Sequence, residues 1–144
     1  AGEKVWIVFV DIHVLDYDGN LFDASALGTI AALLDTYMPK VERDVIIYGE
    51  KTAEKLPMLH KPVETTFAKI NKSIVVDPSL DEELVMDARL TVATDENGTI
   101  CAMQKGGSGT LTQEEILDII KRGVSKGNEL RKFLEGSLWA ERRK

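Results

Sequence analysis

The densest group of acidic side chains lies between two predicted strands and could support metal-assisted chemistry. Its members are Asp77, Asp81, Glu82, Glu83 and Asp87. Converging carboxylates can hold magnesium against a phosphodiester, because a hard cation prefers oxygen ligands and keeps several waters. The alternative is the acidic first turn of a short helix, where the helix dipole favours negative charge. Because charge runs usually face solvent, the residues alone favour the helix start.

A second run of oxygen-bearing side chains has spacing that suggests a calcium loop: Asp16, Asp18, Asn20 and Asp23. A calcium loop also needs a glycine after its third ligand and a closing glutamate at its twelfth position. Leu21 and Leu27 occupy those places. The run therefore predicts a turn between a strand and a helix.

Other motifs with catalytic potential are incomplete. Lys105 precedes the glycines of Gly106 to Gly109 instead of following them, and Thr110 stands where a nucleophile elbow needs glycine. This stretch predicts a flexible connection. His13 and His60 have no second histidine or cysteine at metal-ligand spacing, so both are predicted to be structural or solvated, and no metal or other cofactor is expected.

Composition narrows the class of protein. The chain has 144 residues, of which 44% are hydrophobic and 29% charged, enough to build a substantial core without disulfides. Its net charge of −6 argues against strong non-specific binding of nucleic acid. A single cysteine, Cys101, fits a reducing, cytoplasmic location and is expected to pack as a small apolar residue. No apolar run approaches the length of a membrane helix.

Basic groups outnumber acidic groups only after Thr112. This tract could be a surface for RNA or for an acidic partner. The basic groups are offset by nearby acids, so a solvated helix stabilised by mixed charge pairs is the favoured explanation, and the tract identifies no particular RNA-binding residue.

The first part of the chain predicts strands that flank a helix. Residues Lys4 to Leu15 are apolar and β-branched, as in a buried strand. Asp23 is expected to cap a helix that ends by Pro39, with an apolar stripe at Ala24, Leu27, Ile30, Ala31 and Leu34. A short strand is predicted from Asp44 to Tyr48, and Gly49 to Pro62 reads as a connection or an exposed hairpin.

The second part predicts two antiparallel pairs and a long helix. The strands are Glu64 to Ile70, Ser73 to Val76, Ala88 to Thr94 and Thr99 to Gln104, the last two joined by Asn97-Gly98. A capping box of Thr112 and Glu115 begins an amphipathic helix. The sequence thus predicts an α/β (α+β) fold with mixed and antiparallel sheets packed with helices.

Four runs resemble the RNase PH family, and within it the non-catalytic RNase PH-like subunits of archaeal exosomes. They are VDIHVLDYDGNLFDAS (Val10 to Ser25), KPVETTFAKI (Lys61 to Ile70), VDPSLDEE (Val76 to Glu83) and TDENGTI (Thr94 to Ile100). The resemblance implies two βαβα modules and a hexameric ring around an RNA channel. Active members use phosphate to cleave the 3′-terminal phosphodiester of RNA, with carboxylates that hold magnesium.

The resemblance also implies that the phosphate site of this chain is degenerate. The loop of active members resembles Asp-Gly-Gly-Thr-Arg, whose hydroxyl, amide and guanidinium groups bind an anion. This chain has Asn20, Leu21 and Phe22 at the last three positions, which removes both the hydroxyl and the cation. Asp81 and Asp87 match the spaced carboxylate pair of active members, so retained acids without their anion site predict an inactive centre.

The family pattern divides the chain into the remainder of a first module (residues 1–50), a connection (51–62), a second module (63–135) and a frayed tail (136–144). The opening strands and helices of the first module would then be missing, through proteolysis, cloning or location on another chain.

The resemblance therefore implies a structural subunit of an exosome core ring. Its expected partners are the catalytic RNase PH-like subunit, RNA-binding cap proteins and, through the complex, RNA. Two alternatives remain open: an active phosphate-dependent 3′-to-5′ exoribonuclease that uses Asp81 and Asp87, and a ribosomal or small-molecule-binding protein that shares only the fold.

Overall fold

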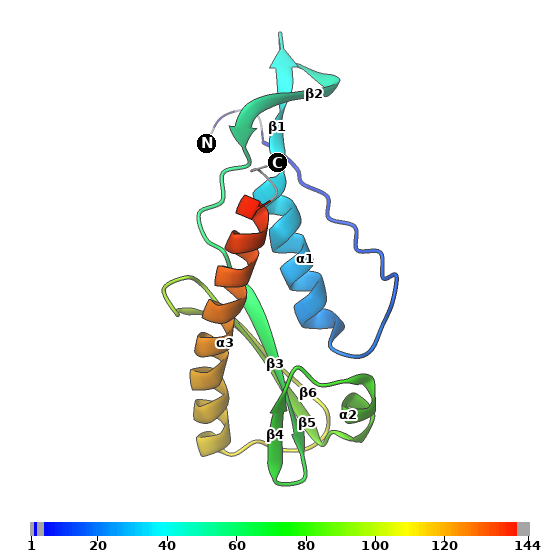
Figure 1. The fold of residues 1–144 in the computed structure, drawn as a ribbon, viewed down its shortest axis with the longest axis vertical. Helices are drawn as coiled ribbons and strands as arrows, with labels where there is room; N and C mark the ends of the chain where they lie inside the picture. The colour runs from blue at the N-terminus through cyan, green and yellow to red at the C-terminus, as the bar shows by residue number, and fades with distance from the viewer. Residues whose placement is uncertain (1, 3–4, 141–144) are drawn as a thin grey trace.

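The computed structural model describes residues 2 and 5–140 of the chain. A four-stranded antiparallel sheet with order β4-β3-β5-β6 lies beside two long helices, and a separate two-stranded hairpin projects from the far end of α1 (Figure 1). The elements are α1 (Leu21–Asp35), β1 (Tyr37–Glu42), β2 (Val45–Lys55), β3 (Val63–Ile70), β4 (Ser73–Val76), α2 (Leu80–Val85), β5 (Ala88–Thr94), β6 (Ile100–Gly106) and α3 (Gln113–Ala140). The predicted mixture of helices and antiparallel sheets is confirmed.

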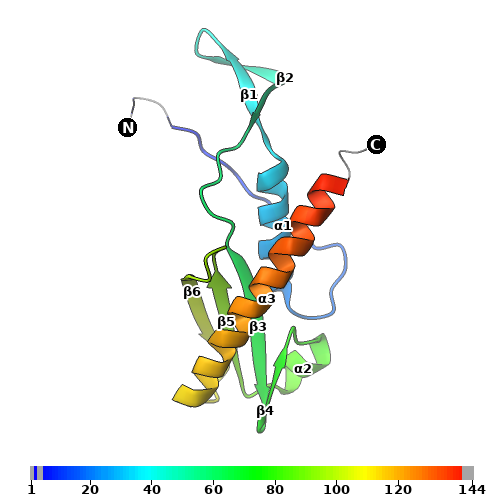
Figure 2. The ribbon, with the colours of Figure 1, turned by 60° about the vertical axis from the view of Figure 1, so that its left-hand side comes forward.

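The hydrophobic core lies between α3 and one face of the sheet. Phe67, Leu90 and Val92 alternate along β3 and β5 and meet Ile119 of α3. Each of these four side chains is almost wholly buried. Figure 2 shows α3 crossing the sheet, with α1 beside the upper part of α3.

Local sequence signals in this half of the chain are confirmed. β4 and β5 have the predicted bounds, and Gly98 takes a left-handed φ of 79° in the turn between β5 and β6. The amide of Thr112 donates to Glu115 Oε2 at 2.7 Å, and the amide of Glu115 donates to Thr112 Oγ1 at 3.2 Å. This reciprocal pair is the predicted capping box at the start of α3.

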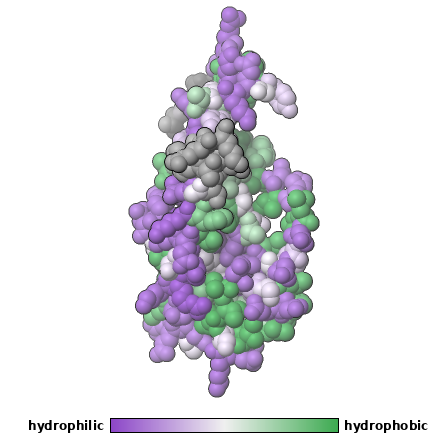
Figure 3. Space-filling view, viewed as in Figure 1, coloured by the Kyte–Doolittle hydropathy of each residue, from purple (hydrophilic) through white to green (hydrophobic). Residues whose placement is uncertain are grey.

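The segment predicted as the first strand forms no strand. Residues 5–15 have no regular secondary structure and are solvent-exposed, with Val5 84% and Leu15 97% exposed. No strand among the described residues pairs with this segment, and a strand needs a neighbour to satisfy its backbone groups. Along the right-hand margin of Figure 3, where Figure 1 places this segment, hydrophobic residues (green) lie at the surface among hydrophilic ones (purple). Lys4, the predicted first residue of the strand, lies outside the described residues.

The hairpin corrects the predicted strand at Asp44 to Tyr48. Two strands are present, and β2 continues to Lys55, so only residues 56–62 of the expected connection lack regular structure. Pro39 does not end the helix, which stops at Asp35, but lies within β1 between two register shifts. Proline is tolerated there because each strand of a two-stranded sheet has a free edge.

Three further expectations are wrong in detail. α1 begins at Leu21, so its N-cap is Asn20 and Asp23 lies in its first turn. Cys101 is exposed, because every residue of β6 before Gly106 is exposed on this edge strand. α3 continues past Gly136 to Ala140, whereas residues 141–144 of the expected tail lie outside the described residues.

Across the part of the chain that the structure describes, no helix is long and apolar enough to cross a membrane.

Candidate functional site

The loop before α1 packs tightly against the start of α2. The Leu80 amide donates to the Asp18 carbonyl at 3.1 Å. Gly19 has a φ of 91°, and a Cβ at this position would lie 2.5 Å from the backbone carbon of Ser79. Only glycine suits both the left-handed conformation and this close approach. The two acidic runs singled out in the sequence are therefore one structural site.

Carboxylates of the group between Asp77 and Asp87 hold the loop before α1 in place. Glu83 Oε2 accepts from the Tyr17 hydroxyl at 2.9 Å, and Glu83 Oε1 accepts from the Asn20 amide at 3.1 Å. The hydrogen bond to Glu83 raises the pKa of Tyr17 above its ordinary value. Asp77 Oδ1 accepts from Asn20 Nδ2 at 2.6 Å. Two of the five clustered acids, Asp77 and Glu83, thus act as acceptors for the loop that precedes α1.

Asp23 joins α1 to the sheet. Its Oδ2 accepts from the Thr66 amide at 2.7 Å and from Asn20 Nδ2 at 2.9 Å, and its Oδ1 accepts from the Thr66 hydroxyl at 2.7 Å. Thr66 Oγ1 lies 2.9 Å from Thr91 Oγ1, so the network continues across two strands. Asn20 is only 4% exposed, and its Oδ1 has no donor among the described residues.

The predicted carboxylate pair lies on the exposed side of the same region. Asp81 is exposed in the first turn of α2, and the exposed Asp87 follows the helix. Asp87 Oδ2 accepts from the Asn71 amide at 2.7 Å, and the Asp87 carbonyl accepts from the Gly109 amide at 2.7 Å. No three metal-binding side chains converge anywhere in the described residues. In this arrangement Asp87 supports two turns of the second module.

Leu21 and Phe22, which the resemblance places in the phosphate loop, carry apolar side chains, but a cation approaches Phe22 from another strand. Phe22 is 42% exposed, and the guanidinium carbon of Arg89 lies 4.4 Å from the centre of its ring. The sequence analysis did not single out Arg89. The alternation of β5 places it opposite the core face, but no local signal shows that it meets a helix 67 residues earlier in the chain.

A groove of about 750 Å³ opens beside this joint, between α1 and α3. Its lining includes Asn20, Asp23 and Asp77 near the loop before α1, the charged Lys126 and Glu129 of α3, and apolar side chains of both helices. The joint between α1 and the sheet is thus open on one side.

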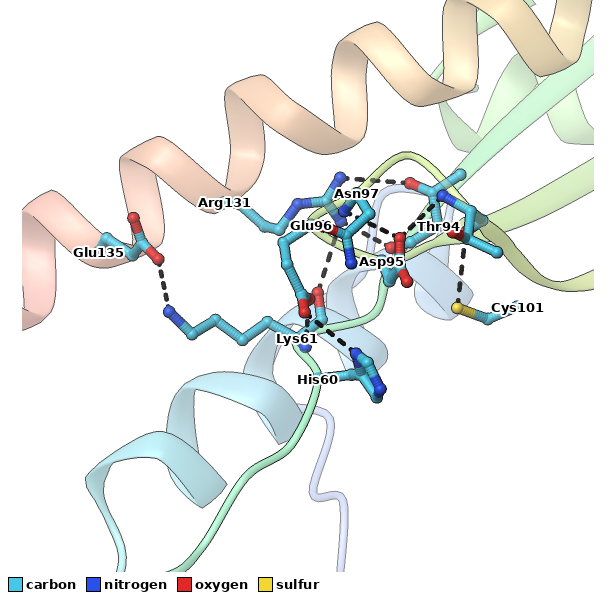
Figure 4. A network of polar contacts seen from close by, with 10 residues as sticks. His60, Lys61, Thr94, Asp95, Glu96, Asn97, Cys101, Arg131 and Glu135 are labelled. Atoms are coloured by element: carbon cyan, nitrogen blue, oxygen red, sulfur yellow. Dashed lines mark hydrogen bonds and ion pairs between the residues drawn. The ribbon is translucent and has the colours of Figure 1, made fainter.

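A second polar network holds the segment between β2 and β3 against the turn between β5 and β6 (Figure 4). Arg131, only 5% exposed, reaches from α3 to the Thr94 carbonyl, with Nη1 at 2.6 Å. Glu96 accepts from the Lys61 amide at 3.0 Å and contacts His60 Nδ1 at 3.0 Å. The Lys61 amide, with the amide of Glu96 itself and His60, lowers the pKa of Glu96 from 4.5 to about 2.

Two family models match the chain on either side of residues 40–59. Residues 60–126 match the model described as the 3′ exoribonuclease family, domain 2, and residues 1–39 match domain 1 of that family. The chain belongs to the 3′ exoribonuclease, or RNase PH, family. Its domain 2 match contains the four-stranded sheet and half of α3, and its domain 1 match contains α1. The candidate site therefore lies where two RNase PH domains meet.

Individual relatives agree with this assignment. The chain is 51% identical over 141 residues to exosome complex component Rrp42 of Thermococcus gammatolerans, covering 92% of this chain and 50% of that protein. An archaeal exosome core structure matches with a TM-score of 0.81 and 42% identity over 93% of this chain and 52% of its own. An Archaeoglobus fulgidus exosome with RNA bound to the active site has a TM-score of 0.71 and 37% identity, covering 82% and 44%. The chain spans about half the length of these relatives.

Proposed function

We propose that this chain is part of a structural subunit of an exosome core ring. It supports 3′-to-5′ RNA degradation by pairing with a catalytic RNase PH-like subunit and by helping to form the RNA channel. The observation that carries the proposal is the 51% identity to an exosome component over nearly the whole chain. The proposed assembly is cytoplasmic and includes RNA-binding cap proteins.

The proposal also holds that the subunit has no phosphorolytic activity of its own. Leu21 and Phe22 supply neither a hydroxyl nor a charge to a phosphate ion. Asp77 and Glu83 are engaged as acceptors for the loop before α1, which leaves Asp81 and Asp87 as a degenerate carboxylate pair. The carboxylate pair therefore lacks the loop hydroxyl and guanidinium with which active members hold the attacking phosphate.

Exposed apolar surface supports a role in assembly. Residues 5–15 expose Val5, Phe9 and Leu15 by more than four fifths each, and the hairpin fully exposes Tyr48. Surfaces of this kind mark contacts with further protein, because burying apolar area is the main favourable term in association. The β1–β2 hairpin in particular is a two-stranded unit, which is marginally stable in water by itself.

The test is assembly of the full-length parent of this chain with an RNase PH-like catalytic subunit of the same organism. Native mass spectrometry of the mixture should show a closed ring that contains both chains in equal number. Elution of the two proteins as separate species at micromolar concentration would contradict the proposal and favour a protein that shares only the fold.

A further inference from the structure

Arg89 is a cation whose guanidinium has unused hydrogen-bond donors. It lies on β5, between the core residues Ala88 and Leu90, and its guanidinium points to the face of the sheet opposite α3, over the Phe22 ring. No hydrogen bond or ion pair joins it to any described residue. Its Nε is buried without a partner, whereas the two terminal nitrogens are not among the buried unpaired atoms. An approaching ligand can therefore meet the terminal end of the guanidinium.

Another arginine of the same chain provides a comparison. Arg122 also lies over an aromatic ring, at 5.1 Å from the centre of Phe67. Its terminal nitrogens, however, donate to the Ile74 carbonyl and pair with Asp118 at 3.4 Å. Stacking on a ring thus does not by itself leave an arginine without a partner, and Arg89 differs from Arg122 in its unused donors.

The surroundings of Arg89 fix the plane of its guanidinium. The Phe22 ring lies on it at 4.4 Å, and Gly106 of the neighbouring strand leaves the space that the group occupies. A Cβ at Gly106 would lie 3.1 Å from Nη2 and 3.2 Å from Nε. A guanidinium held in one orientation loses less side-chain entropy when it binds a ligand.

We propose that Arg89 binds a phosphate group through its two terminal nitrogens, with Phe22 as the platform that holds it. Planar guanidinium groups match phosphate oxygens with two parallel charge-assisted hydrogen bonds. The phosphate belongs to an RNA backbone or is the free inorganic ion. Phe22 stands where the loop of active members has an arginine. Here its ring instead positions the guanidinium of Arg89, which comes from β5. The RNA source rests on the proposed function, whereas binding of the free ion does not.

The experiment compares Arg89→Gln with the matched control Arg122→Gln in the full-length parent protein. Inorganic phosphate is titrated while the arginine Nε resonances are followed by NMR, and a fluorescent single-stranded RNA is titrated into the assembled ring. Arg89→Gln should weaken binding of at least one of these probes about tenfold, and Arg122→Gln should leave both unchanged. For RNA, the salt dependence should fall by about 0.7 in its logarithmic slope, as expected for one lost phosphate contact.

Each outcome decides the inference. Loss of inorganic phosphate binding identifies the free ion, and loss of RNA binding identifies the backbone. Unchanged binding of both probes, or equal losses in the two variants, would overturn the inference. If Arg89→Gln fails to fold, Arg89→Lys keeps the charge but not the two-pronged geometry and should show an intermediate loss, while full retention of binding would overturn the proposed geometry. Ring assembly by wild-type protein is scored separately, so a failure of the proposed function is distinguishable.

Discussion

Glu96 is the residue at which hydrogen bonding most clearly controls protonation. Its pKa is about 2 because the Lys61 amide and other donors stabilise the carboxylate form. The folded-state pKa is below the usual value of 4.5, so this contact contributes fully above pH 4.5 and is lost as the pH falls through about 2.

An acid titration of the Lys61 amide resonance tests this assignment. We expect the amide shift to change with an apparent midpoint near 2, the pKa of Glu96, and the transition to disappear in Glu96→Gln. A midpoint near the ordinary glutamate value of 4.5 would show that the hydrogen bond does not form in solution.

Asp23 illustrates how much of a site depends on contacts between distant residues. The sequence correctly indicates an acid near the start of a helix, but it predicts a cap for that helix. The carboxylate instead accepts from the amide and hydroxyl of Thr66, which lies 43 positions later in the chain. Only the folded structure brings these groups together, and the same holds for Arg89 and Phe22.

Removal of the Asp23 carboxylate should destabilise the joint between α1 and the sheet. Asp23→Ala leaves the buried Thr66 donors without their acceptor, and we expect a loss of roughly 2–3 kcal/mol in the free energy of unfolding. Asp118→Ala removes an exposed acid paired within α3 and should cost less than about 0.5 kcal/mol. Urea denaturation measures both, and equal small losses would show that the Thr66 contacts add no net stability.

At the scale of elements, α3 approaches the sheet closely because two of its glycines, Gly123 and Gly127, face the sheet. A Cβ at Gly127 would lie 2.6 Å from the buried hydroxyl of Thr94, and one at Gly123 would lie 3.1 Å from Thr65 Oγ1. Glycine normally weakens a helix, so its presence here reflects packing against β5 and β3.

Alanine substitutions at two helical glycines should therefore have opposite effects. Gly127→Ala is expected to destabilise the protein by about 1–3 kcal/mol through overpacking. Gly28→Ala, in α1 with nothing within 4 Å of the added Cβ, should stabilise it by about 0.5–1 kcal/mol. Thermal unfolding of the two variants measures the difference, and stabilisation by both would mean that α3 lies further from the sheet than the structure shows.

Elements whose signals are local were predictable, whereas elements that need a distant partner were not. The bounds of β4 and β5, the Asn97-Gly98 turn and the Thr112 capping box follow from short-range patterns. Residues 5–15 carry the pattern of a buried strand, but a strand forms only where another strand pairs with it. The sequence predicts only one short strand of the β1–β2 hairpin, because the register shifts on both sides of Pro39 interrupt the regular alternation of side chains along β1.

At the scale of the whole molecule, the structure joins residues that match domain 2 of the RNase PH family to residues that match domain 1. Particular hydrogen bonds join these two parts. Glu83 and Asp77 accept from the loop before α1, and Asp23 accepts from β3. Glu83, Asp77 and Asp23 thus have a structural use that does not require catalysis. This accounts for their presence in a subunit whose proposed role is to complete a ring.

Release of nucleoside diphosphates from RNA, in the presence of phosphate and magnesium, tests the proposed division of roles most directly. The full-length parent of this chain should show no release by itself. The ring assembled with the catalytic subunit should be active, and it should stay active when this chain carries Asp81→Ala and Asp87→Ala. Robust release by the parent protein alone that disappears with Asp87→Ala would contradict the account and identify this chain as an active exoribonuclease.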